Sequence, residues 1–381
     1  MAKKKKKIRA EFRKNRSGRT RPSGWTRQFE QHGFTEEDPL QRERISGKGE
    51  LSRRRTVTGS EVDTGEEPGF EIRLDVDETV CRPGRVLSMH GLASTVEGED
   101  GRLYQCATRR LLKTLSTDQR HVVAAGDRVL FRPVPGTDVN EGVIERVEPR
   151  RGSLCRTSRG RQQILVTNVD QVLIVTSAAQ PRLKPNLIDR LLVTAEKTRV
   201  RPVVCINKVD LVDPVSLQPI VGVYSQMGYR VLLLSAKTQF GIDRLRRTLT
   251  DRESVLIGQS GVGKSSLLNA VDENLELPVA AVSSETQKGR HTTTTARLLP
   301  LTFGGYVVDT PGIRQFQPWD VIPAEVAGLY RDLRPYVSRC RFPDCTHTHE
   351  ADCAVKDAVA DGRLDERRYE SYCHLFAGET E

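Results

Sequence analysis

The stretch that decides the fold is Gly258-Gln259-Ser260-Gly261-Val262-Gly263-Lys264-Ser265, and Ser266 follows it directly. It satisfies the pattern G-x-x-x-x-G-K-[ST], with the apolar run 254–257 before it and a helical sequence after it. Glycines at this spacing let consecutive backbone N–H groups turn inward around a β-phosphate at a helix N-terminus. Lys264 can then reach the β- and γ-oxygens, and the Ser265 hydroxyl can ligate Mg²⁺. The stretch predicts a phosphate-binding loop rather than a glycine-rich turn without a ligand.

The sequence around this loop alternates apolar, β-branched runs with helical stretches from about residue 165. The runs expected to form strands are 171–176, 202–206, 231–234, 254–257 and 306–308. Buried strands joined by helical crossovers indicate a mainly parallel α/β sheet.

An acid follows the last of these runs, in Asp309-Thr310-Pro311-Gly312. Phosphate and Mg²⁺ sites form at the carboxyl ends of strands in open α/β sheets. We expect Asp309 to bind Mg²⁺ through water and the Gly312 N–H to sense the γ-phosphate. Asp-x-x-Gly is common in proteins, so this assignment depends on the phosphate loop.

Two further motifs end strands and point to the base. Asn207-Lys208-Val209-Asp210 follows the run 202–206, and Ser235-Ala236-Lys237 follows the run 231–234. The Asp210 carboxylate can accept N1–H and N2–H of guanine, whereas adenine offers neither donor. A base without these donors would leave the carboxylate desolvated and unpaired, which is costly. The backbone of the second motif can donate to guanine O6, so we expect GTP and GDP as ligands and not the ATP of a nucleic-acid-dependent ATPase.

The order of the motifs is unusual, because the base-reading motifs precede the phosphate loop and Asp309. A usual GTPase has the reverse order. The same site survives if the old termini are joined and the sheet is opened elsewhere, which leaves new ends for attached domains. The order predicts a circularly permuted GTPase domain whose nucleotide state can move the segment after residue 318.

The N-terminal part is basic and then rich in short β-like runs. Its first 27 residues carry twelve Lys or Arg, including Lys3 to Lys7, against the single acid Glu11. We expect residues 1–70 to be disordered, as a solubilising tail or, preferably, as an arm that neutralises phosphates. The runs 84–87, 103–106, 126–131 and 142–147 predict a small OB-type barrel that binds RNA.

The composition favours a polyanionic partner outside the membrane. The formal net charge is +10 and 37% of the residues are hydrophobic, which favours nucleic acid as the partner. No window approaches the ~20 apolar residues that a membrane helix needs, and the N-terminus lacks the apolar core of a signal peptide. These features predict a cytoplasmic protein.

A cluster of metal-ligating residues lies near the C-terminus, with the spacing Cys340-x4-Cys345-x-His347-x5-Cys353. Three thiolates and one imidazole are the ligand set of a closed, structural zinc site, because four protein ligands leave no position for water. His349 is an alternative to His347. The cysteines outside the cluster are expected to be ordinary packing residues. Arg339, Arg341 and Lys356 suggest a basic surface around the metal.

With these motifs, the sequence resembles the ribosome small subunit-dependent GTPase A family (RsgA, also called YjeQ) over about residues 75–375. The matching features are the barrel, the permuted motifs, Gly289-Arg290-His291-Thr292-Thr293-Thr294 and the Cys/His cluster. The resemblance implies GTP hydrolysis stimulated by the small ribosomal subunit during its late maturation, and zinc at the same four positions. The long basic N-terminal extension departs from the family pattern.

The residues expected to act in hydrolysis lie between the phosphate loop and the segment after Asp309. Many GTPases orient water with a glutamine after Asp-x-x-Gly, but Ile313 stands there and forms no side-chain hydrogen bond. Slow intrinsic turnover is therefore expected. His291 is the candidate substitute for orienting water, against the alternative of a structural histidine. Thr292 and Thr293 are candidates for completing the Mg²⁺ shell, and the ligating threonine among 292–295 is left open.

The expected architecture is a multidomain α/β chain. Its parts are a disordered basic extension (1–70), an OB-fold RNA-binding barrel (71–157), a circularly permuted P-loop GTPase domain (158–318) and a helical zinc-binding domain (319–381). The expected function is that of a monomeric GTP hydrolase that contacts rRNA of the small ribosomal subunit through barrel, tail and zinc segment, and is released by hydrolysis. The alternative is a non-enzymatic, GTP-holding RNA-binding scaffold.

Overall fold

The structure is a computed structural model, and it divides into two compact units that are described one at a time. Unit 1 comprises residues 1–150 and 158–164, and unit 2 comprises 151–157 and 165–381. The residues described are 6–11, 54–63, 70–74, 76–91, 93–109, 112, 122–135, 140–158, 161–279, 296–309 and 322–379, of which 6–11, 54–63, 70–74, 156–158, 161–163 and 309 are described by their backbone alone.

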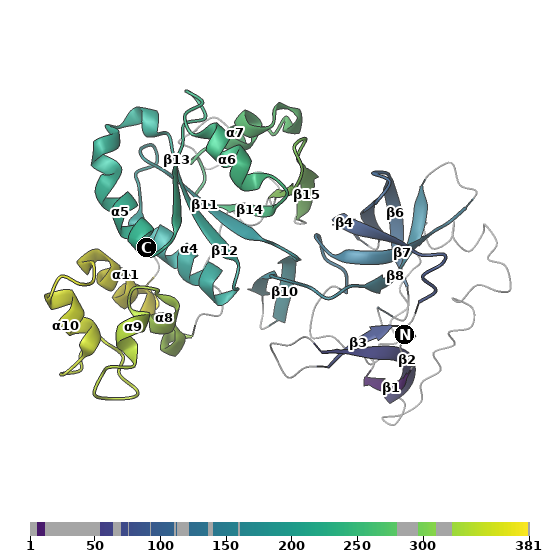
Figure 1. The fold of residues 1–381 in the computed structure, drawn as a ribbon, viewed down its shortest axis with the longest axis horizontal. Coiled ribbons are helices and arrows are strands. Elements are labelled where there is room, and N and C mark those ends of the chain that lie inside the picture. The colour runs from purple at the N-terminus through teal and green to yellow at the C-terminus, as the bar shows by residue number, and fades with distance from the viewer. Residues whose placement is uncertain are drawn as a thin grey trace. The chain divides into compact units, whose positions relative to one another are not determined.

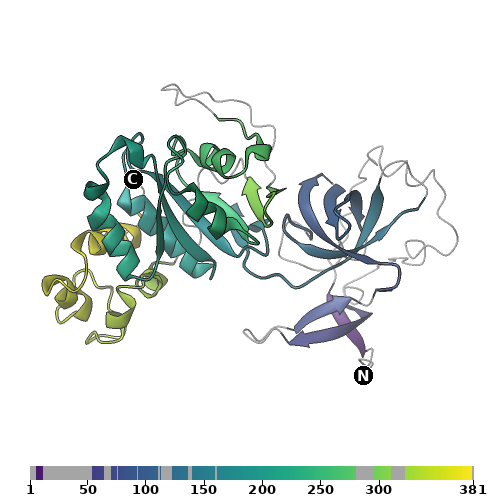
Figure 2. The ribbon, with the colours of Figure 1, turned by 45° about the horizontal axis from the view of Figure 1, so that its top comes forward.

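Unit 1 contains a closed five-stranded barrel (Figures 1 and 2). Its strands are β4 (Arg82–His90), β5 (Ala93–Gly98), β6 (Leu103–Thr108), β7 (Arg128–Pro133) and β8 (Glu141–Val147), in the order β4-β5-β6-β8-β7. The pairing of β4 with β7 closes the barrel. Val86, Phe131 and Ile144 fill its core without exposure to solvent. The four runs expected as strands lie in this barrel, and β5 is an addition to them.

Further strands form two small sheets. β1 (Lys6–Glu11), β2 (Arg54–Asp63) and β3 (Phe70–Leu74) pair antiparallel in the order β1-β2-β3. β1 and β2 lie inside the stretch 1–70 that was expected to be disordered, so the structure differs from the expectation there. The β-branched run Thr56-Val57-Thr58 in β2 favours extended backbone, which outweighs the low apolar content. β9 (Leu154–Ser158) pairs with β10 (Arg161–Val166).

Unit 2 is built on a mainly parallel sheet, as expected. From one edge its strands are β13 (Arg230–Leu233), β12 (Arg201–Asn207), β11 (Gln171–Ser177), β14 (Glu253–Ile257), β16 (Tyr306–Asp309) and β15 (Arg297–Pro300). The first five are parallel, and β15 is antiparallel to β16. Every residue of β11 is buried, because a central strand of a sheet covered on both faces has no polar side.

Four helices cover the two faces of this sheet (Figures 1 and 2). They are α4 (Pro185–Lys197), α5 (Gln218–Gln226), α6 (Ile242–Leu249) and α7 (Lys264–Val271), and the short 3-10 helices η2 (Val209–Leu211), η3 (Pro214–Leu217) and η4 (Glu273–Leu275) lie between them. α6 and α7 share a core with the sheet that includes Leu173, Leu245 and Leu267. α4 packs against β11 and β12.

The chain after residue 322 is helical, as the sequence predicts. Its helices are α8 (Pro323–Leu329), α9 (Arg334–Val337), α10 (Ala354–Ala360) and α11 (Glu366–Phe376). Their core includes Tyr330, Leu333, Val355 and Tyr372, and it also takes in Val193 of α4. The C-terminal helices therefore share a core with the sheet unit. Among the residues that the structure describes, no helix has the length and apolar character needed to cross a membrane.

Candidate nucleotide site and metal centre

The loop between β14 and α7 has a backbone that only glycine adopts without strain. Gly258 has φ +146°, and a Cβ there would lie 2.0 Å from the Val175 carbonyl oxygen. Gly261 and Gly263 have φ of +80° and +91°, in the left-handed region where a side chain costs free energy. The Lys264 ammonium donates to the carbonyl oxygens of Gly258 and Gln259, both at 2.8 Å. The loop thus surrounds the Lys264 amine, which the sequence predicts to bind the phosphates.

The base-reading motif is hydrogen-bonded to this loop. The Asn207 amide donates from Nδ2 to the Val262 carbonyl at 2.8 Å, and a Cβ on Gly263 would lie 2.4 Å from that nitrogen. Lys208 has φ +60°, and its ammonium donates to the Gly261 carbonyl at 2.8 Å. Two motifs more than 50 residues apart in sequence are thereby held at one edge of the sheet, beyond the carboxyl ends of β12 and β14.

The Asp210 carboxylate is oriented by the second base motif. Ser235 is buried, and its hydroxyl donates to Asp210 Oδ1 at 2.6 Å while accepting the Thr238 N–H at 3.1 Å. A carboxylate has about four lone-pair sites, so this bond fixes the direction of the group and leaves acceptor capacity for a ligand. The Ala236 N–H lies 3.4 Å from Asn207 Oδ1. The Ser235 side chain therefore orients Asp210, and the backbone N–H of Ala236 contacts Asn207.

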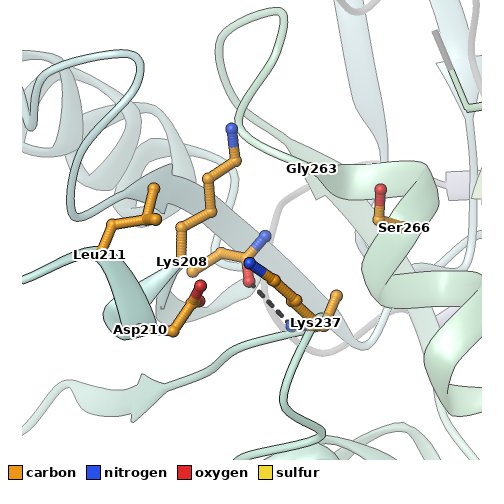
Figure 3. Close-up of a pocket in the computed structure, with 8 residues that line it drawn as sticks. Lys208, Asp210, Leu211, Lys237, Gly263 and Ser266 are labelled. Carbon is orange, nitrogen blue, oxygen red and sulfur yellow. Dashed lines mark hydrogen bonds between the residues drawn. The ribbon is translucent and has the colours of Figure 1, made fainter. Parts of the chain in front are cut away.

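These residues line one cavity of about 340 Å³, which is within the range of small-ligand pockets. Figure 3 shows its side chains converging from three segments: the stretch after β12, the stretch after β13 and the start of α7. The lining residues are Asn207, Lys208, Asp210, Leu211, Ala236, Lys237, Gly263 and Ser266. Sequence reasoning missed Leu211, whose 43% exposure is high for a leucine. Its position directly after the base-reading acid was the available signal.

The residues assigned to hydrolysis lie mostly outside the described part of the chain. The backbone of Asp309 ends β16, which pairs with β14 next to the phosphate loop, but its side chain is not described. His291, Thr292, Thr293, Gly312 and Ile313 lie outside the described residues. Their assigned roles stay predictions. Ser265 lies in the first turn of α7, directly after Lys264.

The four residues predicted to hold zinc come together in space. The ligating atoms of Cys340, Cys345, His347 and Cys353 all lie within 4.8 Å of one another. His347 Nδ1 is 3.4 Å from Cys340 Sγ and 3.5 Å from Cys353 Sγ, and these two sulfurs are 3.9 Å apart. Zn–S bonds of about 2.3 Å at the tetrahedral angle place sulfurs roughly 3.8 Å apart. The donor set and its spacing therefore fit a tetrahedral zinc ion.

The structure also decides between the two candidate histidines. The His347 side chain is buried with the three sulfurs, whereas His349 is outside the cluster with its side chain 82% exposed. The pKa of His347 is lowered, because the effect of burial outweighs the opposite effect of the Glu350 charge. At neutral pH the imidazole is therefore neutral, which is the form that ligates a metal.

Hydrogen bonds donated by α11 and accepted by one glutamate fix the metal-binding loop. The hydroxyls of Tyr369 and Tyr372 donate to the carbonyl oxygens of His347 and Thr346, at 2.7 and 2.6 Å. The Glu350 carboxylate accepts the Thr346 N–H at 2.7 Å. Such outer contacts hold ligands in place for a metal. Sequence reasoning found the ligands and not these supports.

The fold and the site define a class of protein, the circularly permuted P-loop GTPases. A family model described as RsgA GTPase matches residues 147–319. The chain is 39% identical over 305 residues to a "Small ribosomal subunit biogenesis GTPase RsgA" of Sodalis glossinidius, covering 78% of this chain and 85% of that protein. A protein of the same name from Pectobacterium carotovorum is 40% identical over 301 residues, covering 77% and 83%. The chain belongs to the RsgA family of GTPases.

Solved structures agree with this assignment. YjeQ from Thermotoga maritima is 37% identical with a TM-score of 0.64, covering 78% of this chain and 98% of that one. YloQ, described as a circularly permuted GTPase, is 29% identical with a TM-score of 0.62, covering 80% and 97%. The permuted order predicted from the motifs is confirmed.

Proposed function

We propose that this GTPase binds the small ribosomal subunit late in its assembly and leaves it when GTP is hydrolysed. The observation that carries the proposal is the pocket in which Asp210 and the phosphate loop are held together by Asn207 and Lys208. The names of the relatives, which refer to biogenesis of the small subunit, supply the partner. A net charge of +10 suits an RNA-rich partner.

The residues of the nucleotide site divide the binding of GTP between base and phosphates. The Asp210 carboxylate accepts N1–H and N2–H of guanine, and the backbone of Ser235-Ala236-Lys237 donates to O6. The N–H groups of residues 258–264 surround the β-phosphate, and Lys264 leaves the loop carbonyls to reach the β- and γ-oxygens. The Ser265 hydroxyl, and Asp309 through water, would hold Mg²⁺, which when bound would supply positive charge beside the phosphates.

His291 orients the attacking water, because Ile313 has no group that can do so. Thr292 and Thr293 lie beside it in sequence and are suited to contact the γ-phosphate and Mg²⁺. Contact with the ribosomal particle activates His291, so hydrolysis is slow in the free protein and fast on the subunit.

The metal centre has a structural role. Cys340, Cys345, His347 and Cys353 hold one Zn²⁺, and a complete set of protein ligands leaves no position for a reacting water. The ion would cross-link a segment whose helices are all short. RNA is bound by the barrel, the basic N-terminal arm and the surface around the metal, where Arg339, Arg341 and Lys356 supply charge. The chain acts in the cytoplasm as a monomer.

The test is GTP hydrolysis by the purified protein, alone and with isolated small ribosomal subunits, for wild type, His291→Ala and His374→Ala. His374 is a half-exposed histidine at the end of α11 and serves as the matched control. Strong stimulation that only His291→Ala loses is expected. Stimulation that persists in His291→Ala moves the catalytic role to another group. Bound GTP that stays intact in a single-turnover assay with bound subunits would refute the hydrolase and favour a scaffold.

A further inference from the structure

A buried ion cluster joins α4 to the C-terminal helices. Asp189 of α4 is 0% exposed and Arg368 of α11 is 1% exposed. The Arg368 guanidinium donates from Nε and Nη2 to both carboxylate oxygens of Asp332, at 2.9 and 2.8 Å, and its Nη1 lies 2.7 Å from Asp189 Oδ1. Arg367 donates to Asp189 Oδ2 at 3.0 Å. Two acids and two arginines balance, so the burial of each charge depends on the others.

Asp189 is also bonded to the element that follows the base-reading motif. Tyr224 of α5 is fully buried, and its hydroxyl donates to Asp189 Oδ1 at 2.6 Å. Burial and the Asp189 charge raise the pKa of Tyr224, so the hydroxyl keeps its proton and stays a donor. Asp210 lies in η2, and only η3 and most of α5 separate it from Tyr224 in the chain. The Tyr224 hydroxyl therefore ties α5 to α4 at a buried acid, and it also lies 3.3 Å from the Pro185 carbonyl oxygen at the start of α4.

A second contact leads from the base-reading motif to the same helix. The Lys208 ammonium, which holds the phosphate loop through Gly261, also donates to the Gln180 carbonyl at 2.6 Å. Gln180 lies in the loop between β11 and α4. Lys208 therefore holds the loop that leads into α4, and Tyr224 holds α4 itself.

At its other end the cluster reaches the metal-binding loop through α11. The Arg368 guanidinium lies 4.4 Å from the centre of the Tyr330 ring. On the same helix, the hydroxyls of Tyr369, which directly follows Arg368, and of Tyr372, one turn further along, donate to the carbonyls of His347 and Thr346. The residues that grip α4 and those that grip the metal loop thus stand on a single helix of 11 residues.

We propose that guanine binding and the docking of the C-terminal module, residues 322–379, on α4 stabilise each other through Asp189. Partial separation of α11 from α4 would leave buried charges without partners, which is costly. The module is therefore expected to be either docked or released, without stable intermediate positions. A nucleotide that fixes residues 207–224 restrains α4 through Tyr224 and the loop before α4 through Lys208. By linkage, a docked module then raises nucleotide affinity by the same factor. The path begins at the base and not at the γ-phosphate. GDP and GTP are therefore expected to act alike.

The experiment is amide hydrogen exchange of the full-length protein, read at α11, without nucleotide and with saturating GDP or a non-hydrolysable GTP analogue. Each nucleotide is expected to slow exchange of residues 366–376 at least about fivefold, the lower end of measured allosteric couplings. Tyr224→Phe deletes one hydroxyl and keeps the ring, and it should lose most of this protection. Tyr104→Phe deletes a hydroxyl that donates to Asp100 at 2.9 Å in the barrel, and it should keep the wild-type protection.

A second variant tests the reverse direction. Arg367→Gln removes one partner of Asp189 at a position that is 29% exposed, and it should raise the Kd for GDP by about the factor with which GDP protects α11. Unchanged α11 exchange in the GDP complex would overturn the proposal, and so would protection by the GTP analogue alone. Full protection of α11 in Tyr224→Phe would show that the coupling does not run through Asp189, and it would also overturn the proposal. The proposal rests on the proposed nucleotide site. Failure of that site would be recognised separately, because the wild-type protein would then show no binding of GDP in the Kd measurement.

Discussion

Asp210→Asn is the sharpest perturbation of the proposed guanine site. It replaces one carboxylate oxygen by an NH2 group of the same size, so shape is preserved. The neighbour Ser235, whose hydroxyl meets Asp210 Oδ1 at 2.6 Å, can donate to an amide oxygen or accept from an amide nitrogen. The fold should therefore tolerate the change, and the effect should be confined to the ligand.

The magnitude follows from the two donors of guanine. Hydrogen bonds to a charged group contribute about 1.5–3 kcal/mol each, and the asparagine amide accepts one donor and repels the other. Because Asp210 is exposed to solvent, we take the lower end for both bonds. The loss is then about 3 kcal/mol, or roughly 150-fold in the Kd for GDP. Xanthine carries a carbonyl where guanine has N2–H, so the variant should gain affinity for xanthosine diphosphate.

Calorimetric titration with GDP and xanthosine diphosphate measures both effects. Asp213→Asn is the matched control, because Asp213 is an exposed acid three residues further on that caps η3 through the Val215 N–H at 3.0 Å and does not line the cavity. A GDP affinity of Asp210→Asn within threefold of wild type, together with unchanged xanthosine diphosphate binding, would refute the role given to this carboxylate.

Three further predictions concern other parts of unit 2. Gly258→Ala should abolish GDP binding, since the new Cβ would meet the Val175 carbonyl oxygen at 2.0 Å. Gly222→Ala, with open space around it in α5, should instead raise stability by about 0.4–1 kcal/mol in urea titrations; equal GDP binding by the two would contradict the loop geometry. Metal analysis should find one zinc per chain, lost in Cys353→Ser and kept in Cys205→Ser, which changes a buried cysteine of β12; retention in Cys353→Ser would remove that ligand. Asp272→Asn should cost on the order of 1–2 kcal/mol at pH 7: burial raises the pKa of Asp272, but hydrogen bonds from Thr302 and Asn274 outweigh it and lower the pKa. This contribution is present above the unfolded pKa of about 3.9 and is lost as pH falls through the folded pKa, so a difference between wild type and variant that persisted in strong acid would contradict it.

The sequence predicted the parts of the site that have short-range signatures. The phosphate loop and the metal ligands each lie within 14 residues, and their spacing alone carries their chemistry. The parallel strands were predictable because β-branched apolar runs such as β11 are buried on both faces. β5 was not predicted, since the polar Ser94 is among its inward-facing, buried residues and interrupts the apolar alternation.

What the sequence did not predict depends on contacts between distant segments. Nothing near Asp189 or Arg368 distinguishes them from charges on a solvated helix face, and their burial arises only when α11 packs on α4. The same holds for Ser235, whose hydroxyl turned out to orient Asp210 across 25 residues, whereas its motif had suggested a backbone role. Leu211 lines the cavity because η2 turns it there.

The ion cluster also constrains how the chain folds as it is made. Asp189 and its partner Arg367 are 178 residues apart, and synthesis proceeds at roughly 5–20 residues per second. For roughly 10–35 s after α4 leaves the ribosome, α11 has not yet been synthesised. Asp189 therefore has neither arginine partner during this time. During this time Asp189 must face water or a chaperone rather than the position it finally occupies. α11 therefore completes the packing of the nucleotide-binding unit late in synthesis, and a chain that stops short of α11 is expected to reach the cell's quality control with α4 incompletely packed.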